Sequence, residues 1–129
     1  MTHHENLKVL VFISNDQSLL EDVLSYFTEN GYPKVQADGR ESQIEHLAQA
    51  GQHRIVSNEI DNFESFKLLE SSFPGSVQLI GVTQKDGGMP NTSEHSSFMG
   101  HADHHLGIKN DQPLADQLEA FIETVDFSL

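Results

Sequence analysis

Four short polar segments carry the side chains of this 129-residue chain that could do chemistry, and each lies at the end of an apolar run. They are residues 14–16, 59–61, 83–84 and 109–110, which contain carboxylate, hydroxyl, amide and ammonium groups. Carboxylate oxygens suit a hard cation such as Mg²⁺, while ammonium and hydroxyl groups suit the oxygens of an anion. In open parallel sheets, ligands bind beyond the carboxyl ends of the strands. We therefore predict the functional site at these four positions.

A second group of residues is rich in histidine: His95, His101, Asp103, His104 and His105. Imidazole and carboxylate ligands suit Zn²⁺ or Ni²⁺. The spacing matches no zinc pattern, however. Only His101 and His105 have the i, i+4 spacing of a helix, in a stretch that we interpret as a loop entering a strand. We therefore predict a polar surface segment without a bound metal, and metal binding is the alternative.

The elements that position these groups begin with the run Lys8–Ser14 (KVLVFIS). This apolar run is rich in β-branched and aromatic residues, which is typical of a strand buried on both faces of a parallel sheet. The helix that follows is predicted to have Asp16 as its N-cap and Gly31 beyond its C-terminus. Ser18 and Glu21 have the spacing of a capping box.

The rest of the chain repeats this pattern of strand and helix. Asp111 is the predicted cap of the last helix, with Pro113 in its first turn. The polar segment 84–97 is predicted to be a long mobile loop that holds at most one short helix. Further strands are predicted at 34–37, 54–60, 76–83 and 105–109, and helices at 41–50, 63–73 and 114–125. The expected fold is therefore a single α/β domain over residues 1–129, a doubly wound five-stranded parallel sheet of (βα)5 form.

Composition excludes several classes of partner. Seven Lys and Arg stand against twenty Asp and Glu, which gives a formal charge of −13. A chain with so few cations cannot build the basic face that nucleic acids or anionic membranes require. It has no Cys, and its first residues resemble neither a signal peptide nor a membrane span, so we expect a cytoplasmic protein.

The residues at two strand ends give the sequence a family resemblance. Thr83 closes the run SVQLIGVT, and Lys109 lies in HADHHLGIKN, which is similar to a GADDYLxKP stretch with Asn110 in place of the proline. Together with these residues, the order and spacing of the predicted elements resemble the receiver domain of bacterial two-component response regulators, which has flavodoxin-like topology. The resemblance covers nearly the whole chain. The resemblance implies that Thr83 and Lys109 occupy positions that bind the phosphoryl group in a phosphorelay, and that His105 lies near the aromatic switch position.

The other half of the receiver arrangement is missing. The family's acidic pair corresponds here to Ser14 and Asn15, with Asp16 as the nearest carboxylate. The phosphoacceptor position corresponds to Glu59, or to Asp61 if a gap is allowed. We therefore expect no firmly bound cofactor, and at most weak binding of Mg²⁺. Glu59 could stand in for an aspartyl phosphate and pair permanently with the lysine of the fifth strand.

These features lead to three functional hypotheses. The leading one is an atypical receiver, or pseudo-receiver, of a bacterial signalling protein. It would act by protein–protein contact, with a protein partner or a second copy bound through the last helix and fifth strand, and an effector domain could be fused to it. The alternative is a receiver that is phosphorylated on Asp61 or Glu59. A small-molecule-binding α/β domain is disfavoured, because the turn SNDQS has no phosphate-binding glycines. We expect no enzymatic turnover.

Overall fold

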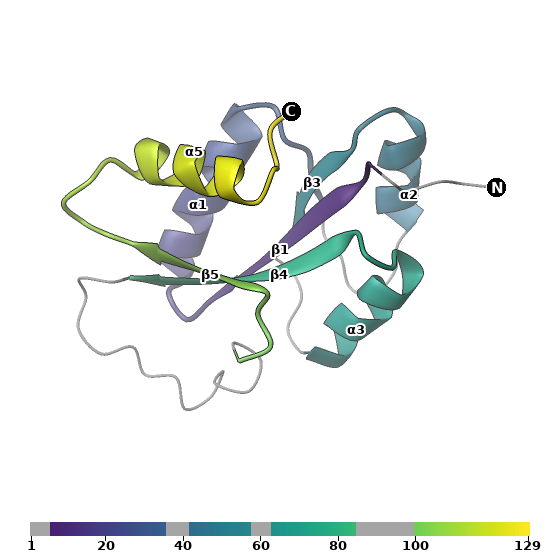
Figure 1. Cartoon of the computed structure of the whole chain (residues 1–129), viewed down its shortest axis with the longest axis horizontal. Helices are drawn as coiled ribbons and strands as arrows, with labels where there is room; N and C mark the ends of the chain where they lie inside the picture. The colour runs from purple at the N-terminus through teal and green to yellow at the C-terminus, as the bar shows by residue number, and fades with distance from the viewer. Residues whose placement is uncertain (1–5, 36–41, 58–62, 85–99) are drawn as a thin grey trace.

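The computed structural model describes residues 6–35, 42–57, 63–84 and 100–129. They form one five-stranded sheet in which every strand pair is parallel (Figure 1). The strands are β1 (Lys8–Ser14), β2 (Lys34–Val35), β3 (Arg54–Ser57), β4 (Val77–Gln84) and β5 (His104–Ile108). The helices are α1 (Gln17–Glu29), α2 (Ser42–Gln49), α3 (Phe63–Ser72) and α5 (Leu114–Thr124). The predicted α/β class and five-stranded parallel sheet are confirmed.

The strand order is β2-β3-β1-β4-β5, so β1 lies between β3 and β4. Flavodoxin-like and receiver sheets have the order β2-β1-β3-β4-β5, which is the order that the resemblance implies. This expectation is wrong, because β1 and β3 have exchanged places in the sheet. Parallel pairing fixes the register on both sides of β1, with Val11 level with Ser57 and Ser14 level with Val82. An apolar run predicts a strand buried on both faces, but it does not specify which strands become its neighbours.

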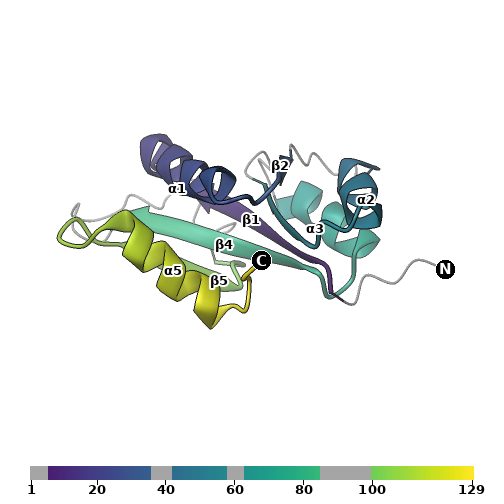
Figure 2. The same cartoon turned by 90° about the horizontal axis from the view of Figure 1, so that it is seen from above.

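Two hydrophobic cores cover the two faces of the sheet, because successive strand residues point to opposite sides. In β1, Leu10 and Phe12 pack against α1 and α5, whereas Val9, Val11 and Ile13 pack against α2 and α3. In Figure 1, α1 and α5 accordingly lie on one side of the strands and α3 on the other. Figure 2 shows α1 beside β1, and α5 beside β4 and β5. The fold is therefore doubly wound, as predicted.

An aromatic cluster lies in the core at the end of α1, where the segment after α5 packs against it. Phe127 is fully buried and stacks on Tyr32, with ring centroids 5.2 Å apart and planes inclined by 9°. Phe27 packs edge-on against both rings. On the other side of this segment, the ammonium group of Lys8 donates to the Asp126 carbonyl at 2.9 Å. The segment after α5 is thus held by the core and by a strand residue.

The predicted helix boundaries are partly confirmed. Asp16 is the N-cap of α1, and its Oδ1 accepts from the Leu19 backbone N–H at 3.1 Å. Gly31 follows the helix with φ +93°, a conformation that favours glycine. Because Asp16 caps the helix, the expected capping box of Ser18 and Glu21 is wrong.

At the last helix, Asp111 is not the cap. Pro113 is the N-cap of α5, and no side chain bonds the exposed N–H groups there. Proline lacks an N–H and its fixed φ suits this position. The predicted loop 84–97 lies outside the described residues, apart from Gln84, which belongs to β4. None of the helices in the described ranges has the length and apolar character that a membrane span needs.

Candidate functional site

Three of the four predicted site segments lie together at the carboxyl ends of the strands, a region called the carboxyl edge below. Ser14 at the end of β1 is level with Val82 of β4, and Thr83 is level with Gly107 of β5. Lys109 directly follows β5. Since these strands are neighbours in the order β1-β4-β5, their polar ends are adjacent, as the sequence predicted.

The fourth segment belongs to β3, which lies on the far side of β1. Ser57, the last residue of β3, is level with Val11, so β3 ends before β1 does. Neighbouring strands are about 4.8 Å apart, so β3 lies about 10 Å from β4 and about 14 Å from β5. Glu59 and Asp61 themselves lie outside the described residues.

This order separates groups that a receiver needs together. In the receiver order, the phosphoacceptor strand lies directly beside the strand that bears the hydroxyl. Here β1 lies between β3 and the strand of Thr83, and both β1 and β4 lie between β3 and the strand of Lys109. The permanent pairing of Glu59 with Lys109 stays a prediction, because Glu59 lies outside the described residues.

The polar groups at the end of β1 bind backbone atoms. The Ser14 hydroxyl donates to the Val82 carbonyl at 2.8 Å and accepts from the Asp16 backbone N–H at 3.0 Å. The Asp16 carboxylate caps α1. Only Asn15 and Asp16 separate β1 from α1, which is too short for the eight-residue loop that cradles phosphates in nucleotide-binding proteins.

Two glutamines hold the ends of β4 and β5: Gln84, which lies in a predicted site segment, and Gln117, which the sequence analysis did not single out. The Gln84 side chain donates to the Ile108 carbonyl and to Oδ1 of Asn110. Gln117 on α5 binds the backbone of Lys109 twice: its Oε1 accepts from the N–H at 2.8 Å and its Nε2 donates to the carbonyl at 2.9 Å. Gln117 lies four residues after Pro113, and the start of α5 has no side-chain cap. This spacing is the one signal in the sequence that could have indicated the role of Gln117.

Lys109 and His105 remain exposed at this end of the molecule. The Lys109 ammonium forms no hydrogen bond or ion pair with another residue in the described ranges, whereas its backbone is fixed by Gln117. His105 is level with Gly81 of β4, and its neighbour Leu106 is buried in the core beneath α5. The role of His105 as a switch residue stays a prediction.

The histidine-rich stretch does not converge within the described residues. The His101 ring stacks on Phe63 at the start of α3, with centroids 3.9 Å apart, whereas His104 packs edge-on against Phe121 of α5. No group of three or more His, Asp or Glu side chains that could hold a metal ion occurs in the part of the chain that the structure describes. His95 lies outside that part.

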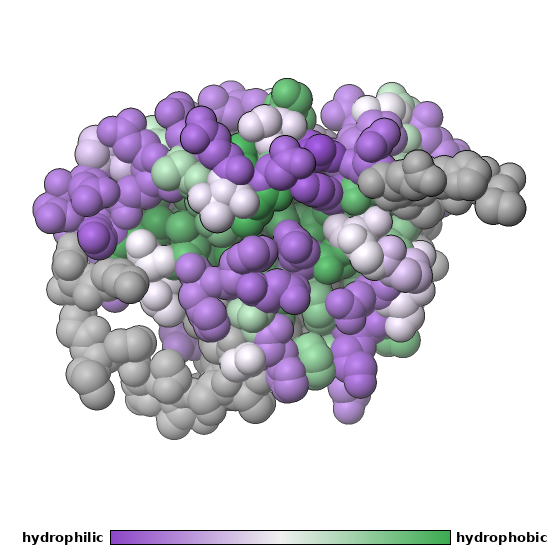
Figure 3. All heavy atoms as spheres, in the orientation of Figure 1, coloured by the Kyte–Doolittle hydropathy of each residue, from purple (hydrophilic) through white to green (hydrophobic). Residues whose placement is uncertain are grey.

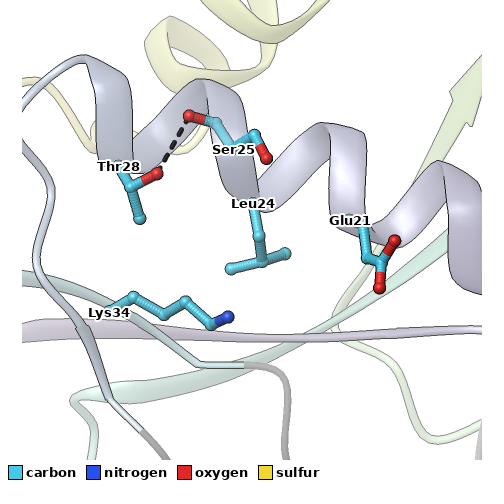
Figure 4. Close-up of a pocket in the computed structure, with 5 residues that line it drawn as sticks. All are labelled: Glu21, Leu24, Ser25, Thr28 and Lys34. Carbon is cyan, nitrogen blue, oxygen red and sulfur yellow. Dashed lines mark hydrogen bonds between the residues drawn. The ribbon is translucent and has the colours of Figure 1, made fainter.

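Two shallow hollows flank α1, away from the predicted site. One, of about 250 Å³, lies between α1 and the edge strand β2, where Lys34 extends along the underside of the helix with Leu24 and Glu21 above it (Figure 4). The other, of about 270 Å³, lies between α1 and α5, and its lining includes Tyr26 and Glu119.

Tyr26 in the second hollow has a perturbed acidity. Partial burial raises the pKa of its hydroxyl above the ordinary value of 10.0, and the negative charge of Glu119 and a hydrogen bond to that carboxylate raise it further. Burial also raises the pKa of Tyr32. Both phenols therefore stay protonated and able to donate a hydrogen bond throughout the neutral range.

Comparisons with known proteins do not assign the chain to a family. No protein-family model and no curated protein sequence matches it. A search of solved structures found the crystal structure of a gluconokinase from Sinorhizobium meliloti 1021, with 13% identity and a TM-score of 0.43 over 95% of this chain and 97% of that one.

One expectation is corrected by this comparison. The matched structure is that of an enzyme, so the expectation that this chain has no enzymatic activity is withdrawn. A TM-score of 0.43 carries no argument about a substrate or a reaction of this chain. The site is therefore interpreted from its own residues.

Proposed function

We propose that this chain is a regulatory protein–protein interaction domain, which is similar to an atypical receiver in its residue pattern, differs from one in strand order, and works without receiver-type phosphorylation. The observation that carries the proposal is the position of β1 between β3 and β4. This order moves the strand of the expected phosphoacceptor away from Thr83 and Lys109. A phosphoryl group at the end of β3 would then lack the neighbouring hydroxyl and ammonium groups that a receiver provides.

The bonding at the carboxyl edge supports the same proposal. Mg²⁺ requires several oxygen ligands in tight octahedral geometry. Near the end of β1, the Asp16 carboxylate caps α1 and the Ser14 hydroxyl already bonds Val82 and the Asp16 N–H. The cap uses Oδ1 of Asp16, so only Oδ2 of this carboxylate remains for a metal that needs several oxygen ligands.

The surface that we propose for protein contact is formed by α5 and β5. β5 is an edge strand, and α5 exposes a polar face that includes Asp116 and Glu119. Figure 3 shows hydrophilic side chains over the α1 and α5 side of the molecule. The occupant would be a protein partner or a second copy of the chain. A role in bacterial signalling in the cytoplasm is part of the proposal and rests on the residue pattern around Lys109.

A titration followed by amide NMR tests the proposal. The domain is titrated with Mg²⁺ and then with beryllofluoride or acetyl phosphate, and the amides of Ser14, Thr83 and Lys109 are observed. We expect no saturable shift at these three positions up to tens of millimolar Mg²⁺, an order of magnitude that would reveal even weak carboxylate sites. A saturable shift confined to them would contradict the proposal and restore a phosphoaccepting receiver that uses Asp61 or Glu59.

A further inference from the structure

The hollow between α1 and α5 combines an apolar floor with an acidic rim. Its apolar lining includes Ile122 of α5 and Leu129, whose side chain is 69% exposed. Tyr26 of α1 is half-buried at one wall. Glu119 and Glu123 line it from α5, one helical turn apart and both exposed. A side chain with an apolar stem and a positive head fits this distribution.

The two glutamates have no positive partner of their own. No Lys, Arg or His lines this hollow, and neither carboxylate forms an ion pair within the described ranges. Like charges at positions i and i+4 of a helix repel each other. A cation placed between Glu119 and Glu123 would remove this repulsion and gain attraction from both. The hollow on the other side of α1 differs, because its lining includes a cation, Lys34, as well as Glu21.

Tyr26 adds a planar group beside the acids. Its hydroxyl is hydrogen-bonded to Glu119, which ties the phenol to the carboxylate rim. A guanidinium group can stack on an aromatic ring and donate to two carboxylates at once, whereas an ammonium group is a compact point charge. The combination of a half-buried aromatic ring with two carboxylates therefore favours arginine over lysine.

We propose that the hollow lined by Tyr26, Glu119 and Glu123 docks an arginine side chain from a basic segment of a partner protein. The stem of the arginine would lie over Ile122 and Leu129. The overall charge of −13 steers a basic segment towards this surface and repels nucleic acid and anionic lipid. The proposal deepens the protein-interaction role proposed above, and it rests on that role for its biological meaning.

The chain contains a built-in probe for this site. Tyr26 and Tyr32 are its two tyrosines, it has no tryptophan, and both tyrosines line the hollow. Intrinsic tyrosine fluorescence therefore reports on the hollow alone. The experiment titrates the full chain with a hexa-arginine peptide at physiological ionic strength. Hexa-lysine serves as the comparison peptide.

Two double variants separate a specific site from general attraction. Glu119→Gln with Glu123→Gln removes two charges from the rim, and Glu21→Gln with Glu70→Gln removes two exposed charges elsewhere. All four positions are on helices and exposed, and Glu→Gln preserves helix propensity. We expect saturable binding of hexa-arginine with a change in tyrosine fluorescence, weaker binding of hexa-lysine, and about a tenfold loss of affinity in the rim variant. The control variant should change the affinity less than about twofold.

Three results would overturn the proposal. They are the absence of saturable binding of hexa-arginine, an equal loss in both double variants, and equal affinity for hexa-lysine. None of these results affects the Mg²⁺ and beryllofluoride titration, which tests the proposed function at the opposite end of α1. Failure of the docking site and failure of the interaction-domain proposal are therefore distinguishable.

Discussion

The carboxyl edge of the sheet and the hollow between α1 and α5 are both polar, but their polar groups are used differently. At the edge, Ser14, Gln84 and Gln117 bond the backbone of neighbouring segments. In the hollow, Glu119 and Glu123 face solvent without a cation. The edge is therefore held together by its own side chains, whereas the hollow leaves two carboxylates for a partner.

The difference shows that residue type at a strand end is weak evidence for a binding site. The edge has the hydroxyl, carboxylate and ammonium groups of a phosphoryl site, yet the Ser14 hydroxyl and the Asp16 carboxylate are occupied by backbone groups at the ends of strands and helices. A group with a backbone partner must lose that bond before it can bind a ligand, which costs about 1 kcal/mol for an ordinary hydrogen bond. The carboxylates in the hollow pair with no cation, and a carboxylate that accepts one hydrogen bond, as Glu119 does from Tyr26, still has acceptor sites for a ligand.

The largest effect is expected from the aromatic cluster behind the hollow, where Phe127 stacks on Tyr32, which lines the hollow. Phe127 is fully buried against Phe27 and Tyr32. Phe127→Ala should lower the free energy of unfolding by about 3–5 kcal/mol, because it leaves a cavity in the aromatic cluster. Urea denaturation followed by circular dichroism measures the loss. Leu129→Ala, at an exposed position of the same segment, should change stability by less than about 0.5 kcal/mol. Similar losses in both variants would show that Phe127 is not part of the core.

At the carboxyl edge, the corresponding change is Gln117→Ala. It removes two hydrogen bonds to the backbone of Lys109 and leaves the strand end without them. We expect a loss of about 1–2 kcal/mol and faster hydrogen exchange at the Lys109 amide. Gln112→Ala, at an exposed position before α5, is the control and should leave that amide unchanged. Unaltered exchange at Lys109 in the Gln117 variant would contradict the description of the edge as self-bonded.

A pair of substitutions at Asp16 distinguishes a helix cap from a metal ligand. Asp16→Ala should lower stability by about 1 kcal/mol, because Leu19 N–H loses its acceptor. Asp16→Asn keeps a capping oxygen and should be close to wild type, since Asn and Asp are comparable N-caps. Chemical denaturation without and with Mg²⁺ measures both. A stabilisation by Mg²⁺ that both variants abolish would indicate that Asp16 binds the metal.

The smallest expected effect is a change in acidity inside the hollow. The folded pKa of Tyr26 is raised, so the folded state favours the neutral phenol. Its contribution to stability is complete below the unfolded pKa of about 10 and is lost as pH rises through the folded value. Glu119→Gln should bring the tyrosinate absorbance transition of Tyr26 to lower pH, because it removes a negative charge beside the hydroxyl. Glu21→Gln should leave the transition in place, and equal shifts would show that Glu119 does not act on Tyr26.

Much of the fold could be predicted from the sequence. The period of apolar residues indicated every described strand and helix, and Asp16 and Gly31 marked the ends of α1 through ordinary capping chemistry. The order of the strands could not be predicted, because burial on both faces does not specify neighbours. That order decides the function of the edge, since it places β1 between β3 and β4.

The candidate sites could also be predicted only in part. Thr83 and Lys109 lie at one edge because each marks the end of a strand, and their role in a phosphoryl site stays a prediction. The clamp formed by Gln117 and the hollow beside Tyr26 could not be predicted, because both depend on how α5 packs across the sheet. Glutamate pairs one helical turn apart are ordinary in a solvated helix and become informative only beside an aromatic wall.

One experiment on a single isotope-labelled sample compares the two regions directly. Amide spectra are recorded with Mg²⁺ and beryllofluoride, and then with hexa-arginine. We predict that the amides of Ser14, Thr83 and Lys109 do not respond to the first addition, and that the amides of Tyr26, Glu119 and Glu123 shift saturably on the second. Saturable shifts at the first three residues with beryllofluoride would contradict the account and assign the chain a phosphorylation switch.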